Sequence, residues 1–155
     1  MKSPENAPKH AFEYTVRVQP HHTDYGGIVW HGNYVAWLEA ARVEYLRSHG
    51  IEFADWINCG VDLPVVDLSI QYRQPLALGM TALVKCWMSP SQSVRIVWRY
   101  AIYNAANQEL CASAEVTLVP IQQQPRKILR RLPEPMRSDF ARLSSAIVTA
   151  GTAKI

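Results

Sequence analysis

Hydrophobic and polar residues alternate in five stretches of the chain, and such alternation is typical of strands that bury one face. The first stretch spans residues 12–18 and ends before Pro20. The other four lie close together after residue 65, at residues 66–73, 81–88, 94–103 and 110–119. Turn-forming residues separate the last three, at 89–91 and at 104–108. The pattern predicts five strands, the last four forming an antiparallel meander.

A different pattern holds between residues 32 and 48, which have helix-forming composition. At 100° per residue, apolar side chains cover every side of this helix, with Tyr34 and Leu38 on one side and Val35 and Trp37 on others. A helix that is apolar all round is a buried helix. Gly50 follows as a plausible C′ glycine that ends it.

Two shorter helices are expected on either side of the meander. The first covers residues 51–58, where Phe53, Trp56 and Ile57 pack down. The second covers residues 133–145 and places Met136, Phe140 and Leu143 on one face. Residues 1–10 and the last ten residues lack periodicity and are expected to be tails, and residues 122–131 are basic and polar.

These elements predict an α+β domain in which one five-stranded antiparallel sheet curves around a long central helix. The 155 residues form a single domain with a core at about 12–120. One helix rarely covers five strands, so we expect some strand surface to contact a partner chain. Apolar residues on the nominal outer face point the same way: Leu83, Trp87, Val97 and Val119.

Composition narrows the class of protein. The net charge of +3 permits an anionic ligand but shows no dense basic face for nucleic acid. The N-terminus has no apolar signal region, and no run approaches 18 apolar residues, so we expect no membrane span and a cytoplasmic protein. Cys59, Cys86 and Cys111 have neither disulfide nor zinc spacing, and we expect reduced, buried thiols.

The candidate chemistry lies in the polar loop of residues 21–30, which leads into the long helix. Asp24 is the only acid of this loop and is followed by Gly26 and Gly27, which let the backbone approach a ligand closely. A helix N-terminus presents unpaired N–H groups and a positive dipole end. The loop therefore pairs a carboxylate with a donor site. Asp24 could equally be a turn or capping residue, because TDYGG is good turn chemistry.

The loop and helix together resemble the hot-dog acyl-CoA thioesterases. The family pattern T-D-x-x-G-x-V-x-[HY]-x-N-Y, followed by a helix with a Glu, is matched by Thr23, Asp24, Gly27, Val29, His31, Asn33, Tyr34 and Glu39. The resemblance is narrowest to the 4-hydroxybenzoyl-CoA thioesterase family, including its Tol-Pal-associated branch. It covers residues 12–120, and the segment Tyr72-Arg73-Gln74-Pro75 also fits.

The resemblance implies an enzyme that hydrolyses an acyl-CoA to free acid and CoA, without a cofactor or metal. Asp24 would be the nucleophile or the general base, and the backbone N–H of His31 would polarise the thioester carbonyl. Substrate-binding candidates are Tyr25, Gly27, Trp30 and Gly32. Tyr25 departs from relatives that carry a small residue or proline there, which narrows the pocket. Relatives assemble as dimers or tetramers with the site at the subunit boundary, so a homodimer or homotetramer is expected.

Several residues keep more than one interpretation. His31 could act through its backbone, through its side chain, or only as a helix-start residue. Glu39 could be a second catalytic carboxylate or pair with Arg42 at i+3. A metal site built from the loop histidines and Asp24 is disfavoured, because adjacent His21 and His22 point differently.

The aromatic and basic side chains are also open to two interpretations. Trp30, Tyr34 and Trp37 either pack the helix or form an aromatic acyl pocket. A basic group either meets the phosphates of coenzyme A or is a solvated tail: Arg126, Lys127, Arg130 and Arg131.

Two other functions compete with hydrolysis of a short-chain or aromatic acyl-CoA. A hot-dog dehydratase or hydratase is disfavoured, because those sites pair a His with an acid across subunits in a different motif. A non-catalytic acyl-thioester binding protein would keep the pocket but would not need Asp24. No residue in the sequence specifies the acyl group.

Overall fold

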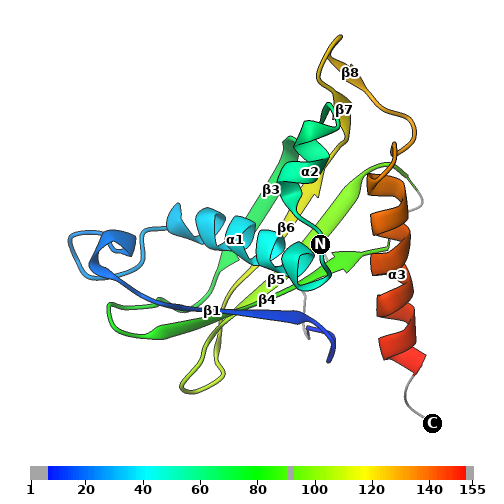
Figure 1. Cartoon of the computed structure of the whole chain (residues 1–155). Coiled ribbons are helices and arrows are strands. Elements are labelled where there is room, and N and C mark those ends of the chain that lie inside the picture. Colours follow the sequence, from blue (N-terminus) through cyan, green and yellow to red (C-terminus); the bar gives the residue numbers. More distant parts are fainter. Residues whose placement is uncertain (1–6, 91–92, 153–155) are drawn as a thin grey trace.

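The structure is a computed structural model that describes residues 7–90 and 93–152, and in it one five-stranded antiparallel sheet curves around a long helix (Figure 1). The helix is α1 (Asn33–Ser48). The strands of the sheet are β1 (Phe12–Arg17), β3 (Val65–Tyr72), β4 (Thr81–Ser89), β5 (Ile96–Asn104) and β6 (Leu110–Leu118). This confirms the predicted α+β hot-dog architecture.

The strand order is β1-β4-β5-β6-β3, so the predicted four-strand meander is only partly right. Strands β4, β5 and β6 do follow one another through hairpins. Strand β3 instead pairs with β6, with Ile70 opposite Ala114, and occupies one edge of the sheet. Alternation shows which face of a strand is buried but leaves its neighbour undetermined, because any apolar face can complete the same core.

Helix α1 packs over β1 and β4 and buries Tyr34, Trp37, Leu38 and Tyr45. Its opposite side is open, because Val35 is 39% exposed and Ala36 and Glu39 are also exposed. The prediction that α1 is buried on every side is therefore wrong for a single chain. The sheet contacts only one side of the helix, and no other element of the described chain covers the rest.

The end of α1 follows the prediction. Gly50 has φ +74°. Its N–H donates to the carbonyl of Arg47, and the N–H of Ile51 donates to the carbonyl of Leu46. This is the left-handed C-terminal cap that glycine allows, and it turns the chain sharply into the next helix.

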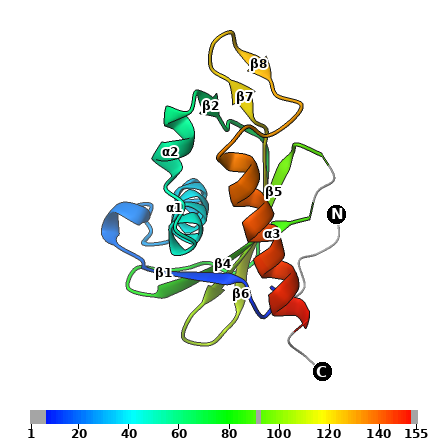
Figure 2. The ribbon, with the colours of Figure 1, turned by 45° about the vertical axis from the view of Figure 1, so that its right-hand side comes forward.

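The two shorter helices flank the far end of α1 (Figures 1 and 2). Helix α2 (Phe53–Asn58) buries Trp56. Helix α3 (Met136–Thr152) buries Met136, Phe140 and Leu143, as predicted. It runs past residue 145 into the segment expected to be a tail, so that prediction is wrong over residues 146–152. The sequence of residues 146–152 has no periodic pattern of its own. The helix continues through them because its first turns are fixed by the packing of Met136, Phe140 and Leu143.

A small second sheet was not predicted. It contains β2 (Val61–Asp62), β7 (Ile121–Gln122) and β8 (Lys127–Ile128), and each strand is too short to show alternation. Residues 122–131 therefore include a hairpin rather than only a polar stretch.

The remaining predictions on burial have mixed outcomes. Cys86 and Cys111 are free and buried, but Cys59 is free and exposed, because it lies at the turn that closes α2. Leu83, Trp87 and Val97 are half-buried on the outer face, whereas Val119 is buried. The predicted tail at residues 1–6 and the turn at residue 91 lie outside the described residues. None of the helices described is long and apolar enough to cross a membrane.

Candidate active site

The loop between β1 and α1 is held by its own backbone and by the segment after β3. The N–H of Asp24 donates to the carbonyl of Ile28 at 2.8 Å. The N–H of Val29 donates to Leu76, and that of Trp30 donates to His22, each at 2.9 Å. The loop therefore forms a narrow hairpin with Asp24 close to its tip.

The Asp24 carboxylate is oriented by this turn. Its Oδ1 accepts hydrogen bonds from the N–H groups of Gly26, at 2.8 Å, and Ile28, at 3.3 Å. Gly27 has φ +75°, which an L side chain rarely adopts, so the glycine is what lets the turn close. Oδ2 has no hydrogen bond to any described residue and remains available. Asp24 therefore does act as a turn residue through Oδ1, and Oδ2 is left to react with a substrate or a water molecule.

The start of α1 presents two unused donors. Among the residues described, nothing accepts the N–H of His31 or that of Gly32. The carbonyl of Trp30 accepts the N–H of Asn33 at 2.9 Å, so the N–H of His31, on the same peptide, points away from the helix. These two N–H groups match the unpaired donors expected at a helix N-terminus.

Tyr72 fixes the peptide between these donors. Its Oη donates to the carbonyl of His31 at 2.7 Å, from the end of strand β3. Carbonyl and N–H of a trans peptide point in opposite directions, so this bond turns the N–H of Gly32 away from β3. The Asn33 side-chain amide also donates to the carbonyl of His22, which ties the helix start to the loop. Beside the donors lies a cleft of about 220 Å³ lined by His31, Tyr34 and Tyr72.

Trp30 and Gly32 form a second close contact at the helix start. A Cβ at Gly32 would lie 2.4 Å from Cζ3 of Trp30, so any larger residue there would force the indole ring to move. The Trp30 ring is 51% exposed and is free to meet a ligand. Tyr34 and Trp37 are buried and edge-on to neighbouring rings, which makes them packing residues. The predicted aromatic cluster therefore divides into one exposed ring and two core rings.

Comparison with known proteins shows to which family a chain with this site belongs. The family model of the thioesterase superfamily matches residues 26–111. An acyl-CoA thioester hydrolase of Escherichia coli, YbgC, is 31% identical over 83% of this chain and 95% of its own length. The chain belongs to the thioesterase superfamily.

Two further matches agree. A candidate esterase of Synechocystis is 49% identical over 85% of this chain and 80% of its own. The crystal structure of a DHNA-CoA thioesterase from Staphylococcus aureus superposes with a TM-score of 0.79 at 27% identity, over 90% of this chain and 94% of that one. The superfamily match and this fold confirm the resemblance seen in the loop and helix.

One histidine of this thioesterase loop, His22, is part of its packing. Nδ1 of His22 accepts the N–H of Gln19 at 2.9 Å, and its ring stands edge-on to Trp37. Burial, and secondarily the neighbouring His21, lower the pKa of His22, which favours the neutral ring. Within the described chain, no three His, Cys, Asp or Glu side chains are grouped to hold a metal ion. The metal-free site remains a prediction.

Two predicted residues lie apart from the donors. Tyr25 is fully exposed at the loop tip and does not line the cleft beside His31, so its substrate role remains a prediction. Glu39 is eight residues beyond His31, about 12 Å along the helix axis. Its suggested pairing with Arg42 is wrong, because no ion pair joins them among the described residues and Arg42 donates to Oη of Tyr100 at 3.1 Å. The buried hydroxyl of Tyr100 offers Arg42 a fixed acceptor.

Tyr72 is the residue that the sequence did not assign. The segment Tyr72-Arg73-Gln74-Pro75 fitted the family, but alternation identifies Tyr72 only as a strand residue. Its role depends on the carbonyl that β3 brings it against, 41 residues away in the chain. Only the tertiary structure supplies that contact.

Proposed function

We propose that this thioesterase hydrolyses acyl-CoA thioesters, with Asp24 as nucleophile or general base and the N–H of His31 polarising the carbonyl. The observation that carries the proposal is the pairing of an oriented carboxylate, with Oδ2 open, and unused N–H donors in one loop. A thioester hydrolase needs these two parts: a group that attacks or activates water, and donors for the developing oxyanion.

Either role of Asp24 gives the same products. As nucleophile, its oxygen bonds to the carbonyl carbon, the C–S bond breaks, and water hydrolyses the resulting anhydride. As base, it takes a proton from the water that attacks the same carbon. In both routes negative charge develops on the carbonyl oxygen, where one N–H donor is worth about 3 kcal/mol in favourable cases. Coenzyme A leaves as the thiolate and is protonated by solvent. The chemistry requires neither metal nor cofactor.

In this proposal the complete active site forms between two copies of the chain, and each copy supplies one part of it. Strand β3 is an edge strand with exposed apolar side chains: Val65, Val66, Leu68 and Tyr72. Such an edge invites pairing with a second copy, and a two-fold axis is the usual arrangement. Antiparallel pairing of two β3 strands would bring the Val65 end of one chain to the Tyr72 end of the other. The His31 loop of one chain would then face the opening between α1 and β3 of its partner.

The basic residues fit the same arrangement. The hairpin of β7 and β8 carries Lys127 and lies at the Val65 end of β3, because β7 pairs with β2, two residues before β3 begins. In a dimer these cations would lie near the partner's loop. There they could form charge-assisted hydrogen bonds with the phosphates of a bound coenzyme A. A cytoplasmic location suits a coenzyme A substrate and a chain with three free cysteines.

The proposal is tested with a panel of acyl-CoAs that contains straight-chain and aromatic acyl groups. The decisive variant is Asp24→Asn, whose amide oxygen still accepts the N–H groups of Gly26 and Ile28 and so preserves the turn. We expect turnover to fall by about 10²–10⁴-fold with unchanged circular dichroism. Asp55→Asn, an exposed carboxylate on α2, is the matched control and should leave turnover unchanged.

Three outcomes separate the alternatives. Near-normal turnover in folded Asp24→Asn would show that Asp24 is only a turn residue. Tight binding of an acyl-CoA without hydrolysis would identify a binding protein instead. Hydration of an enoyl-CoA in place of thioester cleavage would favour the hydratase. Shared sites are tested by mixing two inactive variants after unfolding; a stable, active monomer in light scattering would contradict them.

A further inference from the structure

Two cavities share one side chain, Phe140 of helix α3, in their lining. The first, which we name the edge cavity, has a volume of about 220 Å³ and lies between α1, α2 and the sheet. Its apolar walls include Leu46, Phe53, Leu63 and Trp98. Arg42 also lines it, with its guanidinium donating to Oη of Tyr100 at 3.1 Å. Val65, which is 46% exposed, and the exposed Glu39 complete the lining, so the cavity opens at the β3 edge.

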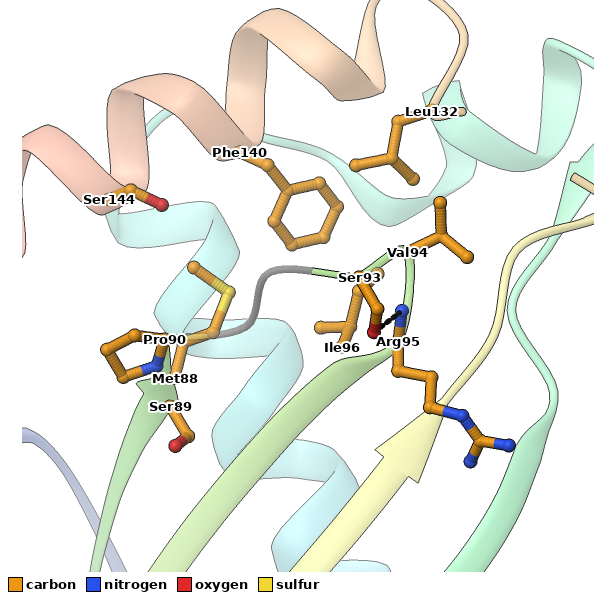
Figure 3. Close-up of a pocket in the computed structure, with 10 residues that line it drawn as sticks. All are labelled: Met88, Ser89, Pro90, Ser93, Val94, Arg95, Ile96, Leu132, Phe140 and Ser144. Atoms are coloured by element: carbon orange, nitrogen blue, oxygen red, sulfur yellow. Dashed lines mark hydrogen bonds between the residues drawn. The ribbon is translucent and has the colours of Figure 1, made fainter. Parts of the chain in front are cut away.

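The second, the hairpin cavity, also has a volume of about 220 Å³ and lies between α3 and the ends of β4 and β5. Figure 3 shows the Phe140 ring projecting from α3 into it, with Leu132 and Val94 to one side and Met88 to the other. The guanidinium of Arg95 points away from the ring. The interior of the hairpin cavity is therefore apolar.

Phe140 and Ile96 are the two residues that line both cavities, so their side chains separate them. Ile96 belongs to strand β5 of the main sheet, whereas Phe140 comes from a helix outside residues 26–111 that match the superfamily. Phe140 is held firmly. Its ring centroid lies 5.0 Å from that of Trp56, and Trp56 Nε1 donates to Oδ2 of Asp139 at 2.8 Å. The partition is thus a fixed part of the fold.

We propose that the edge cavity receives the aliphatic acyl chain of the substrate and that Phe140 is the specificity-determining residue that limits its length. This rests on the proposed function, in which the partner's loop delivers the thioester at the β3 edge. The apolar walls suit a hydrocarbon chain, which gains about fourfold in binding for each methylene removed from water, and the Arg42 guanidinium is already engaged by the Tyr100 hydroxyl. The hairpin cavity is the space into which a longer chain would extend if Phe140 were smaller.

The experiment measures kcat/KM for straight-chain acyl-CoAs from butyryl to palmitoyl with four proteins: wild type, Phe140→Ala, Ser144→Phe and the double variant. Ser144 is exposed and lines only the hairpin cavity, so a phenyl group there fills that cavity without entering the core. We expect Phe140→Ala to raise kcat/KM for dodecanoyl-CoA, relative to kcat/KM for butyryl-CoA, by about tenfold or more. Ser144→Phe alone should leave the ratio unchanged, and the double variant should return it toward wild type.

Each result bears on the proposal. An unchanged chain-length profile in folded Phe140→Ala overturns it, and so does a shifted profile that Ser144→Phe fails to reverse. If Phe140→Ala does not fold, Phe140→Leu keeps an apolar side chain on the buried face and should shift the ratio in the same direction by less; no shift there also overturns it. Wild type that cleaves an aromatic acyl-CoA but none of the straight-chain series overturns the proposal for the edge cavity, and wild type that hydrolyses no acyl-CoA at all refutes the proposed function itself. Active wild type with unaltered variants refutes only the role of Phe140.

Discussion

Replacing Tyr72 with phenylalanine removes one oxygen atom and, with it, the hydrogen bond to the carbonyl of His31. The ring should stay in place, because it stands edge-on to the buried ring of Tyr34 with centroids 5.2 Å apart. The variant therefore leaves packing intact and releases only the His31–Gly32 peptide, which carries the N–H of Gly32 and directly follows the N–H of His31. We expect slower turnover from a protein that folds normally.

The size of the effect follows from the bond that is lost. A hydrogen bond of this kind contributes about 0.5–1.5 kcal/mol net, and Tyr72 is half exposed, so water partly replaces it. If the same energy holds the donors in their productive orientation, kcat falls by about two- to twelvefold. Complete loss of an oxyanion donor would cost about 10²–10³-fold, which sets an upper limit. KM should change little, because the hydroxyl is engaged with the backbone.

The assay compares kcat and KM of Tyr72→Phe with those of Tyr103→Phe. Tyr103 is half-buried on β5 under the Lys85 ammonium, and its hydroxyl has no hydrogen bond in the part of the chain described. The control should match wild type in both constants. Equal kcat values for Tyr72→Phe and wild type would refute the positioning role, as would a rise in KM with kcat unchanged.

Four further predictions concern the rest of the molecule. Leu68→Lys places a charge on the β3 edge and should yield a folded monomer in light scattering with activity reduced at least tenfold; an active monomer contradicts the shared site. Gly27→Ala should lower stability by about 1–2 kcal/mol in urea titration, because φ is positive there; an unchanged midpoint would show that the loop relaxes. A thiol reagent at pH 8 should modify Cys59 in the native protein, but not Cys86, where burial raises the pKa to about 12, nor Cys111, whose pKa burial also raises; fast reaction of all three would contradict the packing. Activity should survive EDTA, since Asp24 and backbone donors supply the chemistry, and recovery of lost activity by one divalent metal would refute this.

The sequence by itself determined the elements whose information is local. Alternation located all five strands of the sheet, and Gly50 ended α1 because only a residue that tolerates positive φ closes the helix there. The buried face of α3 followed from the spacing of Met136, Phe140 and Leu143. The motif around Asp24 identified the family, since a turn feeding a helix start is encoded in consecutive residues.

Only the tertiary structure decided which elements meet. Strand β3 pairs with β6 rather than β4, and periodicity cannot show this because every half-buried strand presents the same face to the core. That pairing places Tyr72 against the His31 carbonyl and leaves an apolar edge at Val65. The same packing turns Val35 and Glu39 outward from a helix that appears buried on all sides in sequence. A side chain's neighbours depend on the path of the whole chain, and a local pattern carries no record of that path.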